Sequence, residues 1–307
     1  MGVGHAAASL FTNQTTYVAG RADNVKGKQL MYAAIPHAEA QSIVSDRFAP
    51  ILRRHTDIAV IVSPPRCGST ALARVFWEHP TIRYYCHEPF EGTYYLEEDL
   101  DSAVANLEGA IDLSEIKRGR PADGANGLVI KEMPYQACEN FSLLASLATG
   151  PLVFLIRDPK LSIASRMAKK REVGDDTLFP EVETGGELLC AQIAWCQEHG
   201  VPYAIVDGSD IRNHPRPLLR KLLARLELDF SEELLRWRSV PRLEIDNLKG
   251  RHRHLYSRVL GSTGLVPATE PVPPIDHFPE EGGFRAHVVK CFKLHQLIRR
   301  NPNLIKV

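Results

Sequence analysis

Hydrophobic positions follow two regular patterns from residue 58 onwards. The continuous apolar, β-branched run IAVIVS (58–63) predicts a buried strand, and ALARVFWEH (71–79), after a short polar turn, has the apolar spacing of a helix. Similar apolar runs predict further strands at 127–133, 151–158 and 202–208. Helical spacing recurs at 139–148, 186–199 and 216–228. This alternation predicts an α/β fold in which a parallel β-sheet is flanked by helices and binds ligands at the carboxyl ends of its strands.

The two ends of the chain depart from this alternation. Residues 1–55 lack a clean period and are interpreted as an N-terminal extension with short helical pieces around 38–52, while 56–307 form the predicted α/β domain. Within that domain, the Pro-rich stretch LVPATEPVPPIDHFPEEGG (265–283) predicts a long irregular loop. The following 284–300 predict a closing helix.

Composition narrows the class of protein and of partner. The 307 residues are 44% hydrophobic and 24% charged, which excludes disordered, collagen-like and disulfide-scaffold proteins. The 37 Lys and Arg balance 37 Asp and Glu, so no overall positive field attracts nucleic acid or an anionic membrane. Any anion-binding site must therefore be local.

The cysteines, histidines and N-terminus suggest a reduced, metal-free protein. The 6 cysteines and 12 histidines show no spacing typical of a zinc site, so we expect free thiols and no metal. The chain has no basic leader followed by a sustained apolar stretch, and no run approaches the roughly 18 apolar residues of a membrane span. We therefore expect a cytoplasmic protein without a membrane anchor. The sequence does not indicate its oligomeric state.

The segment SPPRCGST (63–70) has the form of a phosphate-binding loop, which we call the cradle. A strand that passes through a short Gly-containing turn into a helix N-terminus places several backbone N–H groups around one anion. The nucleotide-triphosphatase form G-x-x-x-x-G-K-[ST] is absent, because Gly68 precedes Ser69, so ATP or GTP hydrolysis is disfavoured. The alternative is a tight turn before a helix that Ser69 caps.

A second segment, FLIRDPKLSIASR (154–166), supports the phosphate-site interpretation. Arg157 ends an apolar strand, a proline stops that strand, and Ser165 and Arg166 follow in a predicted helix. The planar guanidinium of Arg157 and the hydroxyl of Ser165 can converge on a second phosphate. By itself, such a turn is usually an ion-paired surface corner.

Together these segments resemble the sulfotransferases that use 3′-phosphoadenosine 5′-phosphosulfate (PAPS). Residues 65–70 match the family's 5′-phosphosulfate loop P-[KR]-S-G-[ST]-T, with Cys67 in place of the usual Ser, and R-D-P followed by S-R matches its 3′-phosphate motif. The resemblance spans about 57–238 and implies the P-loop sulfotransferase fold, with PAPS as co-substrate and no metal. The implied PAPS-binding residues are Arg66, Cys67, Gly68, Ser69, Thr70, Arg157 and Ser165.

The resemblance also implies catalytic roles for two cations. Sulfuryl transfer leaves charge on the departing phosphate oxygen, which Arg66 and the backbone amides of the cradle would stabilise. Lys131, at the end of a predicted strand, resembles the Lys of the K-T-H-x-P segment in cytosolic members. It is our candidate for a second cation on the sulfuryl group. The alternative is a strand-end Lys that merely extends to solvent.

The family's catalytic His is missing, since Glu132-Met133 stands at its place. A hydroxyl acceptor still needs a general base. Glu88 resembles the acidic base of tyrosylprotein sulfotransferases in its position, and the adjacent His87 has a suitable ordinary pKa. In a strand these two side chains would face opposite ways, so we expect only one to point inward and favour Glu88. Either could instead cap a helix or form an ion pair.

Two further segments are weaker candidates. The basic cluster 249–258 makes Lys249 and Arg251 candidates for the 3′-phosphate, because the family often places a C-terminal basic loop there; a solvated turn is the alternative. We expect 265–283 to form part of an acceptor wall or lid, with His277 and Phe278 as contacts, since an acceptor needs a partly apolar wall that excludes water. A passive connector is the alternative.

The leading prediction is a sulfotransferase that acts on a hydroxyl of a small-molecule acceptor by in-line transfer, with a carboxylate or His as base. A P-loop kinase-like phosphotransferase would need a Lys in the cradle and a carboxylate placed for Mg²⁺, and neither is evident. A non-catalytic adenosine-bisphosphate-binding protein is favoured only by Met133 in place of the usual His.

Overall fold

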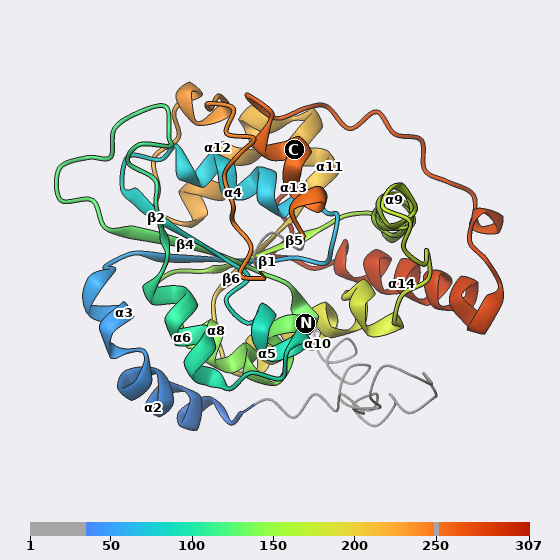
Figure 1. Cartoon of the computed structure of the whole chain (residues 1–307), viewed down its shortest axis with the longest axis horizontal. Helices are drawn as coiled ribbons and strands as arrows, with labels where there is room; N and C mark the ends of the chain where they lie inside the picture. Colours follow the sequence, from blue (N-terminus) through green and yellow to red (C-terminus); the bar gives the residue numbers. More distant parts are fainter. Residues whose placement is uncertain (1–34, 249–251) are drawn as a thin grey trace, which may run out of the picture.

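The computed structural model describes residues 35–248 and 252–307, which form one sheet covered by helices on both faces (Figure 1). The strand order is β3-β2-β4-β1-β5-β6, and neighbouring strands are parallel except β3, which is antiparallel to β2. The strands are β1 (Ile58–Val62), β2 (Ile82–His87), β3 (Ile111–Asp112), β4 (Gly127–Glu132), β5 (Leu152–Ile156) and β6 (Tyr203–Asp207). The predicted α/β fold is confirmed; β2 and the short β3 are additions that the hydrophobic pattern did not indicate.

Alternating side chains along β1 explain the layers. Val60 and Val62 point to one face of the sheet and Ile61 to the other, and all three are fully buried. The helices packed on the Val60 face are α2 (His37–Arg47), α3 (Ala49–Arg54), α6 (Leu100–Glu108), α8 (Phe141–Leu147) and α10 (Gly186–Glu198). Those on the Ile61 face are α4 (Ser69–Trp77), α11 (Gly208–Asn213), α12 (Pro215–Arg225) and α13 (Arg253–Leu260).

The described part of the predicted N-terminal extension lies against this core. Helices α2 and α3 bury Ala40, Val44, Phe48 and Ile51 in the same apolar cluster as β1. Burying one side chain of Val, Ile or Phe contributes about 1.5–3 kcal/mol. Residues 37–54 therefore stabilise the sheet that carries the functional loops.

Parallel topology brings the carboxyl ends of β1, β2, β4, β5 and β6 to the same edge of the sheet. The cradle follows β1, and the Arg157 segment follows β5 and leads into α9 (Pro159–Glu172). The shorter elements before α13 are α5 (Glu91–Tyr95), α7 (Pro134–Ala137), η1 (Cys138–Asn140), η2 (Glu181–Thr184) and η3 (Glu232–Leu235). The edge gathers chain segments that are far apart in sequence.

The Pro-rich segment 265–283, which we call the strap, runs from the region of α13 to α14 (Phe284–Ile298), drawn in orange to red in Figure 1. It is irregular as predicted, apart from the single turns η4 (Ile275–His277) and η5 (Glu281–Gly283). Within the part of the chain that the structure describes, no helix has both the length and the apolar character needed to cross a membrane.

Candidate active site

The cradle exposes the N-terminus of α4. Gly68 is the N-cap, with a left-handed φ of 97°, and Arg66 is also left-handed with a φ of 63°. A side chain at position 68 would be strained by this backbone conformation although the space around it is open. Ser69 is the first residue of α4 rather than its cap, and no side chain among the described residues caps this helix. The first N–H groups of α4 are thus available to an anion.

Cys67 faces away from the cradle opening. Its side chain is buried in the apolar cluster beneath α4, its Sγ lies 3.8 Å from the carbonyl oxygen of Pro65, and burial raises the pKa of its thiol to about 12. The chain of α11 packs so closely here that a Cβ at Gly208 would lie 2.0 Å from the carbonyl oxygen of Cys67. Position 67 can therefore contribute to anion binding only through its backbone.

The predicted second phosphate site adjoins the cradle. Arg157 is 9% exposed; its Nη1 donates to the carbonyl oxygen of Arg66 at 3.1 Å, and its Nε has no partner among the described residues. Arg66 in turn donates from Nε to the Ser165 hydroxyl at 3.3 Å and from Nη1 to the carbonyl oxygen of Leu255. The structure thus brings Arg66, Arg157 and Ser165 together.

Of the three other cations that the sequence analysis singled out, the structure describes one. Arg166 is held by an ion pair with Glu183 and lies over the Phe179 ring, 4.1 Å from its centroid, so its charge is already compensated. Lys249 and Arg251 lie outside the described residues.

The catalytic candidates meet at the ends of β2 and β4. Strand register pairs His87 with Lys131 on neighbouring strands. Glu88, just after β2, has a left-handed φ of 49°, which interrupts the alternation of a strand. Its carboxylate therefore turns back toward His87, with 3.2 Å between Oε1 and Nε2. The expectation that only one of the two points inward was wrong, because it assumed that the strand continues through Glu88.

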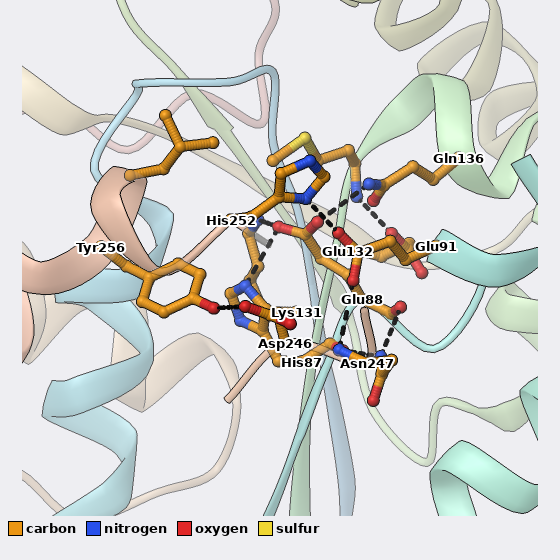
Figure 2. Close-up of polar contacts among 12 residues, drawn as sticks. His87, Glu88, Glu91, Lys131, Glu132, Gln136, Asp246, Asn247, His252 and Tyr256 are labelled. Atoms are coloured by element: carbon orange, nitrogen blue, oxygen red, sulfur yellow. Dashed lines mark hydrogen bonds and ion pairs between the residues drawn. The ribbon is translucent and has the colours of Figure 1, made fainter. Parts of the chain in front are cut away.

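Glu88 is a buried carboxylate with three hydrogen-bond donors (Figure 2). Its Oε1 accepts from Lys131 Nζ and lies beside His87 Nε2, and its Oε2 accepts from Gln136 Nε2 at 2.9 Å. Burial alone would raise the pKa of Glu88, but the charge of Lys131 and the hydrogen bonds from His87 and Lys131 hold it well below its usual range. Glu88 is therefore ionised at neutral pH.

Tyr85 is a residue that the sequence interpretation missed. Its hydroxyl lies 2.5 Å from His87 Nδ1, and burial raises the pKa of Tyr85 well above its ordinary value. The phenol thus keeps its proton and donates it to Nδ1, so we assign the proton of the neutral imidazole to Nε2, facing Glu88. The i, i+2 spacing of Tyr85 and His87 on one strand was the available signal.

Glu132, at the place of the family's catalytic His, binds backbone N–H groups and so has a structural role. Its two carboxyl oxygens accept from the backbone N–H groups of Phe90, at 2.9 Å, and Met133, at 2.7 Å. Burial and the nearby charge of Glu88 raise its pKa well above the ordinary value. Glu132 thus fixes the turn after Glu88, and Met133 lines the cavity.

A second layer holds the Glu88 turn from the other side (Figure 2). Asn247 Nδ2 donates to the carbonyl oxygens of His87, at 2.6 Å, and Glu88, at 3.0 Å. Glu91, which is fully buried, lies 2.5 Å from His252 Nδ1 and accepts from the Asn247 N–H at 3.2 Å. The segment around Asn247 therefore fixes the geometry of the candidate base.

One cavity of about 300 Å³ connects both groups of residues. Its lining includes the cradle, Arg157, Ser165, His87, Glu88 and Lys131. At the Glu88 end, the cavity wall also includes Tyr95, Met133, Tyr135, Gln136 and Tyr256. The sequence-predicted donor and catalytic residues that the structure describes thus share a single space, apart from the Cys67 side chain.

The strap contributes to this cavity in a different way from the prediction. Leu265, Val266 and Glu270 line it, near Arg157. His277 is exposed, and Phe278 is fully buried against α9 and α14 in a separate apolar cluster. The prediction of His277 and Phe278 as acceptor contacts was wrong, because Phe278 anchors the strap after it has left the cavity.

The chain is similar to known sulfotransferase domains. A family model described as "Sulfotransferase domain" matches residues 58–279. Similar solved structures include the sulfotransferase domain from the Curacin biosynthetic pathway (14% identity, TM-score 0.41, covering 78% of this chain and 97% of that chain). Another is the sulfotransferase domain of the Synechococcus PCC 7002 olefin synthase (15% identity, TM-score 0.46, covering 81% of this chain and 97% of that chain). A third is a mouse sulfotransferase complexed with PAP (13% identity, TM-score 0.42, covering 84% of this chain and 90% of that chain).

No curated protein is significantly similar in sequence. The matched family segment nevertheless covers well over half of the chain and contains the cradle, the Glu88 turn, Lys131, Arg157 and Ser165. The chain therefore belongs to the sulfotransferase-domain family.

Proposed function

We propose that this protein transfers the sulfuryl group of PAPS to a hydroxyl of a small-molecule acceptor. The observation that carries the proposal is the single cavity that joins an anion cradle, with Arg66 and Arg157 beside it, to the buried Lys131–Glu88 pair. The first part of this arrangement suits a nucleotide with two phosphate groups, and the second suits removal of a proton.

The described residues fit a donor that carries two separate anionic groups. The N–H groups at the start of α4, with Arg66, would hold the 5′-phosphosulfate, and Arg157 with Ser165 would hold the 3′-phosphate. The buried Arg157 Nε, which has no partner among the described residues, supports this fit because such a donor requires an acceptor. When bound, PAPS supplies an activated sulfuryl group with a bisphosphate as leaving group.

Glu88 is the better base of the two candidates. Both ring nitrogens of His87 are engaged, Nδ1 by the Tyr85 hydroxyl and Nε2 by Glu88, which leaves no free lone pair for a substrate proton. Glu88 is ionised and lines the cavity. We therefore propose that Glu88 removes the proton from the acceptor hydroxyl and that His87 orients the Glu88 carboxylate.

Lys131 links the base to the transferring group. Its ammonium is bonded to Glu88 and lines the same cavity, so it can also contact the sulfuryl oxygens. When the Lys131 ammonium also contacts the sulfuryl group, it stabilises the ionised form of Glu88 less strongly than when it contacts Glu88 alone. The pKa of Glu88 would then rise toward its ordinary value, which makes the carboxylate a stronger base when the proton must be removed.

The side chains at the Glu88 end favour an acceptor with a flat apolar body. Tyr95, Met133, Tyr135 and Tyr256 surround this part of the cavity, while Gln136 presents a polar group. Such a lining excludes water from the reacting hydroxyl, and its few polar groups orient the acceptor. Phenols and small aromatic alcohols are the acceptors that we propose.

A turnover experiment tests the proposal. The full chain is incubated with PAPS and a panel of phenols and aliphatic alcohols, and both sulfated product and adenosine 3′,5′-bisphosphate (here the bisphosphate) are measured. We expect equal amounts of the two products with at least one phenol. Release of bisphosphate without sulfated product, or binding of AMP as tight as that of the bisphosphate, would contradict the proposed function.

A further inference from the structure

The donor end of the cavity contains a carboxylate that the proposed chemistry does not use. Glu270, on the strap, points between two guanidinium groups: its Oε2 lies 3.3 Å from Arg157 Nη2 and 3.5 Å from Arg212 Nη1. Its Oε1 lies 3.4 Å from Arg212 Nη2. One carboxylate is thus shared by two arginines.

Arg212 is held in position independently of Glu270. It belongs to α11, directly after β6, and its side chain is 17% exposed. Its Nε donates to the carbonyl oxygen of Val266 at 2.7 Å, and its Nη2 donates to that of Pro267 at 2.8 Å. These two bonds aim the outer face of the guanidinium at the space occupied by the Glu270 carboxylate.

The Glu270 contacts are weak for such a pair of cations. Charge-assisted N–H···O bonds are normally about 2.7–2.9 Å long, whereas the three contacts here are 3.3–3.5 Å. The side chain of Glu270 is also 43% exposed, so water competes with both contacts. A carboxylate of single charge therefore leaves the two guanidiniums incompletely satisfied.

A phosphate would satisfy this place better than Glu270 does. It presents three oxygens and carries about −1.5 to −2 charges at neutral pH. It could reach Arg157, including the unpartnered Nε, and Arg212 at the same time. The two guanidiniums face the same carboxylate, so they also face the same anion position.

We propose that Arg212 is a second arginine for the 3′-phosphate of the donor, and that Glu270 holds this anion position until the donor displaces it. The inference rests on the proposed function, since it concerns the same nucleotide. It goes beyond the sequence motifs, in which neither residue takes part. Donor binding then has to break the Glu270 contacts, which couples the strap to the nucleotide.

Titration calorimetry of two single variants of the full chain tests both parts. Glu270→Gln removes the competing charge with little change of shape, so the bisphosphate should bind about two- to fivefold more tightly. Arg212→Gln should weaken bisphosphate binding by about ten- to a hundredfold. AMP, which lacks the 3′-phosphate, should bind both variants as it binds the wild type.

Matched controls separate this effect from a general change of charge. Glu280→Gln removes another strap carboxylate that is paired with an arginine, Arg285, and Arg216→Gln removes an exposed arginine paired with Glu232. Neither Glu280 nor Arg216 lines the described cavity, so neither variant should change bisphosphate affinity.

The outcomes distinguish this inference from the proposed function. If the wild type does not prefer the bisphosphate to AMP, the proposed function fails. If the wild type does prefer the bisphosphate, but Glu270→Gln binds it no more tightly than the wild type, then Glu270 does not compete with the 3′-phosphate and the inference is wrong. Equal losses of AMP and bisphosphate affinity in Arg212→Gln would overturn its assignment. Should that variant unfold, the partly exposed Glu270→Gln still decides the proposal.

Discussion

The two ends of the cavity differ in how far their charges are compensated by neighbouring side chains. At the donor end, Arg66, Arg157 and Arg212 lie around the cradle, and Glu270, nearly half exposed, is the carboxylate that contacts two of them. Burial and the nearby charge of Arg157 even lower the pKa of Arg66. This end has an excess of positive charge.

At the acceptor end, charges are arranged in close pairs. Glu88 is paired with Lys131, and Glu91 with His252. Burial lowers the pKa of His252, but the hydrogen bond to Glu91 and the charges of the nearby carboxylates together raise it above its ordinary value. Tyr85 supports this network through the His87 ring. Asn247 supports it through the backbone of the Glu88 turn (Figure 2).

The difference follows from what each end exchanges with its ligand. Buried charges must be compensated. An anionic ligand can therefore compensate the arginines at the donor end only where the protein's own carboxylates do not already do so. A proton moves between groups that are already in place, so that end is preorganised and nearly neutral before any substrate arrives. Under the proposed function, the cavity thus separates recognition of the anionic donor from transfer of the acceptor's proton.

Glu88→Gln should break the acceptor end with the largest effect. The change keeps the size of the side chain but removes its basicity, so turnover on a hydroxyl acceptor should fall by about two to four orders of magnitude. Bisphosphate affinity, measured by calorimetry, should remain near that of the wild type. Glu108→Gln, an exposed change on α6, is the control. If Glu88→Gln retains full turnover while His87→Asn is inactive, the base is His87.

Arg157→Gln should break the donor end. The loss of a charge-assisted contact costs about 1.5–3 kcal/mol, which weakens bisphosphate binding by about ten- to a hundredfold. AMP affinity should change much less, since Arg157 is assigned to the phosphate that AMP lacks. A parallel loss for both nucleotides would show that Arg157 instead supports the cradle through the carbonyl oxygen of Arg66.

Tyr85→Phe sharpens the role of the acceptor network. It leaves the buried Nδ1 of His87 without its donor, which costs about 1–3 kcal/mol of stability, and frees the imidazole to exchange tautomers. We expect turnover to fall about tenfold or less and its pH profile to change, with donor KM unaffected. The ring contact with Trp77, 4.7 Å between centroids, is kept by Phe. An unchanged pH profile would assign Tyr85 a purely structural role.

Cys67→Ser should have the smallest effect. It restores the residue usual in the resembling loop, yet the thiol is buried beneath the cradle and points away from its opening. Because the cradle binds through backbone N–H groups, bisphosphate affinity should stay within about twofold of the wild type. A much larger gain in affinity would show that this side chain can reach the nucleotide.

The sequence by itself determined the framework and the local anion sites. Continuous apolar runs followed by helical spacing predicted the parallel sheet, because buried parallel strands must be apolar on both faces. The cradle and the Arg157 segment were also predictable, since each lies within one strand–turn–helix unit whose conformation depends on adjacent residues. Lys131 was found from its place at a strand end, and Glu88 with its neighbour His87 from the family resemblance.

Only the tertiary structure decided how these residues act together. The Glu88–Lys131 pair joins positions 43 residues apart through the register of β2 and β4, and the left-handed backbone at Glu88 overrides the alternation that the sequence suggested. The Arg212–Glu270 contact joins positions 58 apart, and Asn247 reaches His87 across 160 residues. Such contacts depend on how separate elements pack, and side-chain spacing along the chain does not contain that information.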